Sequence, residues 1–313
     1  IKRKVMNKNK YILLGAVVLG LGLTSCSDFL NVDRYFRDQQ STERIFSDKD
    51  YTLQWLSFCH SRLQGDNLEV GHSDVCPFNF SDDQVFNERG DRFAKFKRGE
   101  YLNSTGGQNA WKWSYDGIYQ ASILLNELYE NEDLTPEEVT DIRGQARFLR
   151  AYFYFELVQL YGDAIIVKKP LDVTDPELKT ARNDRSEVID FAIEDLEAAA
   201  ELLPKFSELS TEDNGRISQE GCWAFLSRVA LYEGTWQKSR GNAERGKALL
   251  DIAAKASGKV IASNTFSLFK PEALGDSAQK YMFILEDVKS NPAGLQKSAN
   301  KEYIFSRRHD EVL

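Results

Sequence analysis

The stretch that decides the fold is "GQARFLRAYFYFELVQLYGDAIIVKKPL", residues 144–171. Its first half and the residues just before it repeat apolar side chains every three or four positions, which is the helical spacing. These side chains form two neighbouring stripes, one of Ile142, Ala146, Leu149, Phe153, Leu157 and Leu160 and one of Phe148, Tyr152 and Phe155. Two adjacent apolar stripes predict a helix that is packed on both sides.

The start of this helix is marked by a capping signal. Thr135 can cap the first turn, Pro136 suits the first helical position, and Glu138 is placed to close a capping box. A proline-bounded connection, "AIIVKKPLDVTDPE" at 164–177, follows the helix. Both ends of the central pattern are therefore defined by local chemistry.

Similar periodicity predicts further helices over 111–130, 186–203, 218–236 and 242–261, after a first helical pattern that includes Ile45, Trp55, Leu56, Cys59 and Leu63. Small residues stand at many of the expected contact positions, as they do in antiparallel helix pairs of tetratricopeptide-like arrays. No strand–turn–helix unit repeats along the chain. The pattern predicts an all-α fold with a tetratricopeptide-like helix-pair scaffold.

Residues 65–110 interrupt this pattern as a long, loop-rich insertion, in which Gly, Asn, Asp and Ser separate short aromatic pieces. Long loops of this kind are usually functional. We take Asp82 and Asp83 as candidate hydrogen-bonding contacts for a ligand. The alternative is that they cap a loop or form a turn.

Trp113 is the candidate aromatic contact for a ligand, because an outward-facing aromatic ring can stack on the C–H surface of a bound molecule. On a helix, Trp111 and Trp113 are about 200° apart and cannot share a face. Trp111 belongs to the apolar stripe with Tyr115 and Ile118, so Trp113 is expected to point outward. The alternative is that Trp113 packs in the core or against a further part of the protein.

The N-terminal residues are typical of a signal peptide, which we assign to residues 1–25. Basic residues up to Lys10 precede the uncharged run 11–23, which is shorter than the ~20 residues of a membrane-spanning helix. The sequence Leu23-Thr24-Ser25-Cys26 resembles the bacterial lipobox, which implies acylation of Cys26. A polar tether over 26–40 and a helical domain over 41–313 would follow. The alternative is a plain secretory signal with a chance cysteine.

The bulk composition excludes several classes of protein. The net charge of −8 over 313 residues argues against nucleic-acid binding, which requires a basic footprint. With Cys26 assigned to lipid, three cysteines remain, and an odd number at wide spacing is no disulfide framework. Cys59, His60, His72 and Cys76 lack the spacing of a metal site. We interpret Cys59 as a buried thiol and the histidines as surface residues, and we expect no metal or other cofactor.

Catalysis is not expected either. Asp82 and Asp83 are adjacent, whereas glycoside hydrolysis needs two carboxylates that face each other across the scissile bond. No nucleophile elbow, phosphate-binding loop or zinc-helix motif occurs in the sequence. Arg147 and Arg150 are interpreted as structural residues that hold neighbouring loops through carboxylate or carbonyl contacts.

The chain resembles the SusD/RagB family of nutrient-binding lipoproteins. The resemblance runs in order through "CSDFLNVD", "WKWSYDGIYQASILLNEL", "GQARFLRAYFYFELVQLYGDAIIVKKPL", "RSEVIDFAIEDLEAAAELLP", "GRISQEGCWAFLSRVALYEGTW" and "NKEYIFS". It covers residues 23–306. In the family "NKEYIFS" falls near the middle, so the resemblance implies that this chain is an N-terminal part of a longer protein.

The resemblance also implies a function. Members sit on the outer face of the outer membrane of Bacteroidota and deliver glycans to a SusC-like TonB-dependent transporter, or peptides in some members. A glycan is the leading ligand because it is the commoner case in the family. The alternatives are a peptide-binding RagB-like member and a helical adaptor that binds another surface protein.

Overall fold

The computed structural model describes residues 45–63, 107–128, 132–210, 213 and 215–306. Within these ranges the chain is helical, and the one extended pairing is an isolated antiparallel bridge between Ala164 and Asn183. The predicted all-α class is therefore confirmed. None of the described helices combines the length and the apolar character needed to cross a bilayer.

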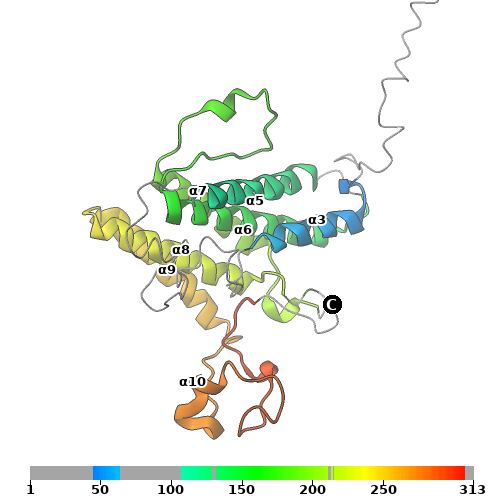
Figure 1. Cartoon of the computed structure of the whole chain (residues 1–313), viewed down its shortest axis with the longest axis vertical. Helices are drawn as coiled ribbons and strands as arrows, with labels where there is room; N and C mark the ends of the chain where they lie inside the picture. Colours follow the sequence, from blue (N-terminus) through cyan, green and yellow to red (C-terminus); the bar gives the residue numbers. More distant parts are fainter. Residues whose placement is uncertain (1–44, 64–106, 129–131, 211–212, 214, 307–313) are drawn as a thin grey trace, which may run out of the picture. The chain divides into compact units, whose positions relative to one another are not determined.

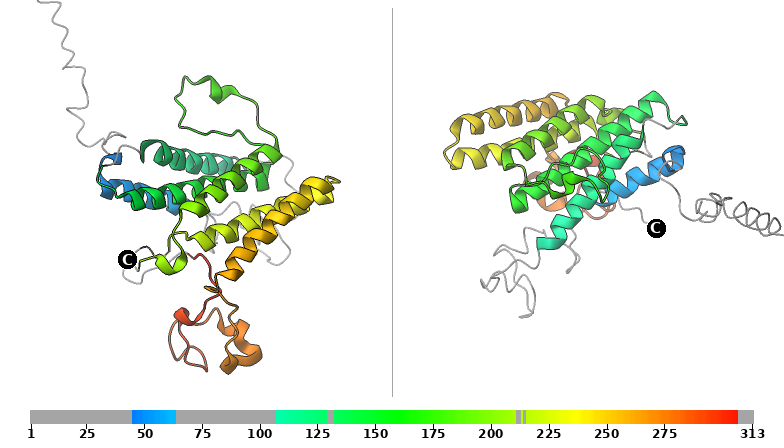
Figure 2. Two further views of the ribbon diagram at one scale, coloured as in Figure 1. Left: turned by 180° about the vertical axis from the view of Figure 1, so that it is seen from behind. Right: turned by 90° about the horizontal axis from the view of Figure 1, so that it is seen from above.

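The long helices are α3 (Lys49–Ser61), α5 (Gly107–Glu127), α6 (Pro136–Tyr161), α7 (Arg185–Leu202), α8 (Gln219–Ser239) and α9 (Ala243–Ala262). Shorter pieces are η4 (Pro176–Lys179), η5 (Phe206–Glu208), η6 (Glu272–Ser277), α10 (Ala278–Tyr281) and η7 (Lys297–Ala299). From α5 to α9 each helix packs against the next in sequence, and α3 packs on both α5 and α6 (Figures 1 and 2). This succession of neighbouring helices is the predicted helix-pair scaffold.

Helix α6 begins as the sequence predicts. The Thr135 hydroxyl accepts a hydrogen bond from the Glu138 amide at 3.2 Å, and the Glu138 carboxylate accepts one from the Thr135 amide at 2.9 Å. The helix ends at Gly162, whose φ of 76° lies in the left-handed region that favours glycine. These two local signals set the length of the helix.

Most side chains of the two apolar stripes of α6 are buried, but Tyr152 is only half-buried and Leu160 is exposed. Ile142, Ala146, Leu149, Phe153 and Leu157 are almost fully buried, but Leu160 is 43% exposed, so its assignment to the buried stripe is wrong. In the last turn of α6 the neighbouring Tyr161 makes the contact with α5, through an edge-to-face packing on Trp111. Leu160 is left outside that contact.

The structure corrects the N-terminal boundary of α5. Residues 107–110 were assigned to the insertion but are helical, and Ala110 is buried. The composition misled because Gly106 and Gly107 are typical of loops. At its other end α5 runs to Glu127, and the predicted end at residue 130 lies outside the described residues and stays a prediction. The rest of the insertion, residues 65–106, lies outside the described residues.

Small residues let neighbouring helices approach closely, as predicted. A Cβ added at Gly246 of α9 would lie 2.9 Å from the carbonyl oxygen of Gly234 in α8, so these two backbones meet directly. A Cβ added at Gly117 of α5 would overlap the ring of Phe153 in α6. These glycines are therefore required by packing between helices.

The segment after α9 has a small core of its own. Phe269, Leu274, Ala278 and Leu285 are buried together, with Tyr281 and Met282 packed against them. The Ser267 amide donates to the Lys301 carbonyl at 3.1 Å, which joins the two ends of this segment. It contacts the helices through Phe305 on Phe148 and through Phe266 on Phe206.

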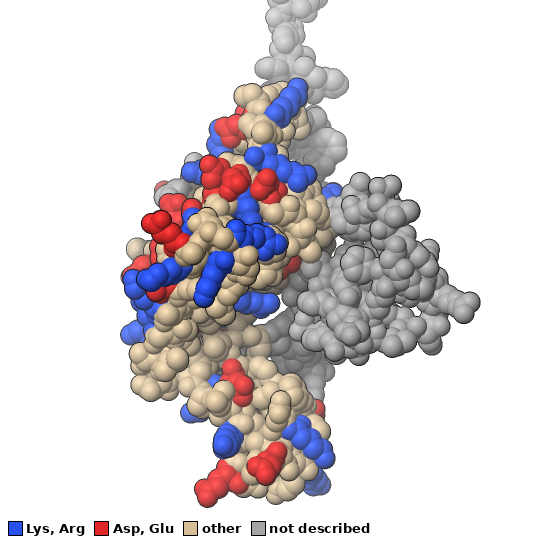
Figure 3. Space-filling view, turned by 90° about the vertical axis from the view of Figure 1, so that its left-hand side faces the viewer, with Lys and Arg blue, Asp and Glu red and all other residues tan. Residues whose placement is uncertain are grey.

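On the face shown in Figure 3, basic and acidic side chains lie interspersed.

A glycine substitution tests the close approach of α5 and α6. We expect Gly117→Ala to lower the free energy of unfolding by about 1–3 kcal/mol, because the added methyl group meets the Phe153 ring. Urea denaturation would measure it.

Gly258→Ala in α9 is the matched control, because a Cβ there meets nothing within 4 Å. It should leave stability unchanged or raise it by up to about 1 kcal/mol, since alanine is the better helix former. Equal effects of the two substitutions would contradict the packing argument.

Candidate functional site

The candidate site in the described residues is a surface formed by Phe58, Arg62 and Trp113, which we call the Trp113 surface. The Trp113 indole N–H donates to the Arg62 carbonyl at 3.1 Å. The Arg62 guanidinium lies 4.3 Å from the centre of the Trp113 ring and 4.7 Å from that of Phe58. Trp113 is 39% exposed and Phe58 is 41% exposed, so solvent reaches both rings.

This surface lies where the insertion leaves and rejoins the helical scaffold. Arg62 is the C-cap residue that directly follows α3, and Trp113 stands in the second turn of α5. The stretch between the two helices is the insertion. The hydrogen bond and the cation–π contact between Arg62 and Trp113 therefore tie together the two ends of the segment that carries Asp82 and Asp83.

The two neighbouring tryptophans point in different directions, as the helical spacing predicts. Trp111 is half-buried, with its ring centre 5.0 Å from that of Tyr161 and 5.1 Å from that of Tyr115. The Arg182 guanidinium lies 4.5 Å from the centre of the same ring. Trp111 is thus a packing residue, whereas Trp113 is the one that reaches solvent.

Sequence reasoning missed the partners of Trp113. Phe58 and Arg62 are four residues apart on α3 and so lie on one helical face, and both are partly exposed. The sequence did contain a signal for this surface, namely an aromatic and a basic residue four positions apart at the end of a helix that leads into a long insertion. The other predicted site residues, Asp82, Asp83 and Cys26, lie outside the described residues and stay predictions.

Arg147 and Arg150 have the structural role that the sequence suggested. Arg150 makes two hydrogen bonds to the Asp195 carboxylate, at 2.7 and 2.9 Å, and one to the Lys168 carbonyl at 3.2 Å. Arg147 adds a third hydrogen bond to Asp195 at 2.7 Å. Asp195 is 1% exposed, so two guanidinium groups neutralise a buried carboxylate between α6 and α7.

Comparison with known proteins agrees with this architecture. Residues 71–231 match the SusD-like family described as "Starch-binding associating with outer membrane". The chain belongs to the SusD-like family.

The relatives of this SusD-like chain are longer than the chain itself. SusD-like protein P25 of Formosa agariphila is 30% identical over 129 residues, which are 41% of this chain and 24% of P25. A SusD-like protein from Bacteroides fragilis has a similar structure, with a TM-score of 0.66 and 22% identity, over 88% of this chain and 47% of that one. A laminarin-binding SusD-like protein gives a TM-score of 0.60 at 19% identity, over 78% of this chain and 50% of its own. The chain thus spans about half of these structures and about a quarter of P25.

Two tyrosines that sequence reasoning missed fix the connection after α6 in this SusD-like fold. The Tyr115 hydroxyl accepts from the Ile165 amide at 2.7 Å and donates to the Ile165 carbonyl at 2.9 Å. The Tyr154 hydroxyl bonds the amide and the carbonyl of Val167 in the same way. Burial raises the pKa of both phenols. Each hydroxyl replaces the hydrogen bonds that a neighbouring strand would supply.

The structure corrects the interpretation of His60 but confirms that of Cys59. Cys59 is fully buried, and burial raises the pKa of its thiol to about 12. His60 is half-buried and not a free surface residue: its Nε2 lies 3.1 Å from the Gln145 side-chain oxygen, against α6. Desolvation, with a smaller contribution from Arg216, lowers the pKa of His60 to about 4. His72 and Cys76 lie outside the described residues.

The depressed pKa of His60 predicts a pH dependence of stability. The unfolded chain binds more protons than the folded chain between the ordinary pKa of 6.5 and the folded value of about 4, so stability falls as the pH falls through this range. Relative to His60→Gln, the natural protein should lose about 1–2 kcal/mol of unfolding free energy between about pH 7 and pH 5. Urea denaturation across this range would measure it.

The comparison with His60→Gln isolates the histidine from other groups. Burial raises the pKa of Glu156 to about 7, which shifts stability in the opposite direction, but Glu156 titrates in both proteins. Parallel stability curves for the two proteins would show that His60 does not carry the effect.

Proposed function

We propose that this SusD-like chain captures a glycan at the cell surface and passes it to a SusC-like TonB-dependent transporter in the outer membrane. The family match over residues 71–231 is the observation that carries the proposal, because the family is described as starch-binding and associated with the outer membrane. A laminarin-binding protein and a surface glycan-binding protein from Bacteroides uniformis share the fold. The mechanism is capture and release without bond chemistry.

The Trp113 surface is the proposed point of ligand contact within the described residues. Its exposed aromatic rings can stack on the C–H face of a sugar. The Arg62 guanidinium beside them can donate hydrogen bonds to hydroxyl groups. Asp82 and Asp83 belong to the insertion whose ends meet at this surface, and we propose that they supply hydrogen-bond acceptors to the same ligand.

A lipid anchor at Cys26 is the second part of the proposal. The lipobox resemblance of residues 23–26 supports acylation at this cysteine, and more than one acyl chain holds a protein stably at a bilayer. An anchored position would keep the glycan-binding surface close to the transporter.

Binding measurements on the natural protein test the capture proposal. Isothermal titration against laminarin, other soluble polysaccharides and oligopeptides should show saturable binding to one glycan class. Trp113→Ala should weaken this binding about tenfold or more, as expected when an aromatic anchor is truncated.

The matched control is Tyr119→Ala, which removes another exposed ring from α5 at 46% exposure. It should leave glycan affinity unchanged, and urea denaturation should show that both variants are folded. Equal loss of affinity in the two variants would contradict a site at Trp113. Binding to oligopeptides alone would support the peptide-binding alternative.

Substitution of the lipobox cysteine tests the anchor. Cys26→Ala should move the protein from the membrane fraction to the soluble fraction of cells and abolish its labelling by a radioactive fatty acid. Cys59→Ala is a control for general thiol labelling, since Cys59 is buried. Unchanged membrane retention and labelling of Cys26→Ala would contradict a lipid anchor at this residue.

A further inference from the structure

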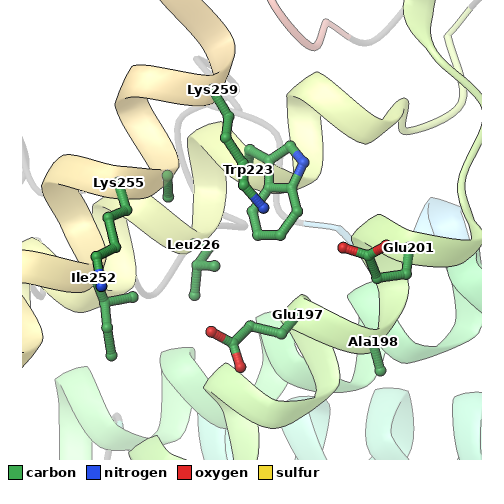
Figure 4. Close-up of a pocket in the computed structure, with 9 residues that line it drawn as sticks. Glu197, Ala198, Glu201, Trp223, Leu226, Ile252, Lys255 and Lys259 are labelled. Atoms are coloured by element: carbon green, nitrogen blue, oxygen red, sulfur yellow. The ribbon is translucent and has the colours of Figure 1, made fainter.

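A groove separate from the Trp113 surface runs between α7 and α9, over α8. Its volume is about 480 Å³, within the usual range for a ligand site. Trp223 and Leu226 of α8 form its floor (Figure 4). The walls are Glu197, Ala198 and Glu201 from α7 and Ile252, Lys255, Ala256 and Lys259 from α9.

The two walls carry opposite charges that do not neutralise each other. Asp190 of α7 and Arg245 of α9 form an ion pair at 2.9 Å, so the two helices are bridged near their N-terminal ends. Further along, Glu197, Glu201 and Lys255 make no ion pair with any residue that the structure describes. Lys259 instead places its ammonium 3.3 Å from the centre of the Trp223 ring. The four charged side chains of the walls are exposed and accessible to a ligand, whereas Trp223 and Leu226 beneath them are buried, at 8% and 1% exposure.

The charges on both walls repeat at the same interval. Glu197 and Glu201 are four residues apart on α7, and Lys255 and Lys259 are four residues apart on α9. Four residues correspond to about 6 Å along a helix axis, or one turn. A second helix in the groove would present its own side chains at this interval.

We propose that this groove binds an amphipathic helical segment of a partner protein. Basic side chains of the segment would face Glu197 and Glu201, and its acidic side chains would face Lys255 and Lys259. An apolar side chain would lie between the walls against Ala198 and Ile252, which are half-buried. Charge complementarity selects this occupant. A neutral glycan could hydrogen-bond to these side chains but would not compensate their charges, whereas a ligand of one sign would be repelled by one wall.

Synthetic peptides test the proposal on the natural protein. The first probe is a helical peptide of about four turns with a leucine stripe, lysines at one-turn spacing on one flank and glutamates on the other. Two control peptides carry only lysines or only glutamates on both flanks. Titration at low salt should show saturable binding of the mixed-charge peptide, weaker binding of the controls, and loss of affinity at high salt.

Charge reversal of the walls locates the site. Glu197→Lys with Glu201→Lys should weaken the mixed-charge peptide roughly tenfold or more and favour the all-glutamate peptide. Adding Lys255→Glu and Lys259→Glu should restore the mixed-charge peptide, which then runs in the opposite direction. The matched control, Glu272→Lys with Glu286→Lys, changes net charge equally outside the groove and should leave affinity unchanged.

Several results would overturn the proposal. The first is that the mixed-charge peptide shows no saturable binding. The second is that the wall variants and the control variants weaken peptide binding equally. The third is that oligogalacturonate binds in a way that depends on the lysines alone, which would make the groove an acidic-glycan site. Glycan capture at the Trp113 surface is measured with different probes and variants, so the two proposals can fail separately.

Discussion

The helical scaffold depends on the neutralisation of one buried carboxylate. Asp195 accepts three hydrogen bonds from Arg147 and Arg150, and Arg150 also holds the carbonyl of Lys168. These contacts join α6, α7 and the connection between them at one point. Removing one partner from a buried ion pair costs about 3–5 kcal/mol, because a charge is left without compensation. A shift in the register of α6 against α7 would therefore separate Asp195 from its arginines and destabilise the fold by a similar amount.

A second recurring interaction is the placement of cations on tryptophan rings. It occurs on two tryptophans of α5 and two of α8. On α5 the pairs are Arg182 on Trp111 and Arg62 on Trp113. On α8 they are Lys259 on Trp223, and Arg185 and Arg240 on Trp236. Each contact is worth about 0.5–2 kcal/mol, depending on how far it is desolvated. A ligand that stacks on one of these rings must share it with a resident cation. Surfaces of this kind favour ligands that also bond to the guanidinium or ammonium group.

The features that the sequence predicted are those set by neighbours along the chain. The capping box at Thr135 and Glu138, the stripes of α6 and the outward direction of Trp113 depend only on helical spacing. The features it missed depend on residues far apart in sequence, such as Gln145 against His60. The groove was missed because it arises from how α7 and α9 lie across α8. The ligand contacts in the insertion and the lipid at Cys26 remain predictions.

The contact between Arg62 and Trp113 also bears on how such a protein can change. It closes the base of the insertion, so the helical scaffold does not need the insertion itself to hold α3 against α5. For a flexible loop whose ends are held, each doubling in length costs only about 0.6 kcal/mol of closure entropy. The insertion can therefore be lengthened, shortened or replaced with little effect on the helices. On the proposal that the insertion contacts the ligand, ligand preference and scaffold stability are separable traits of one chain.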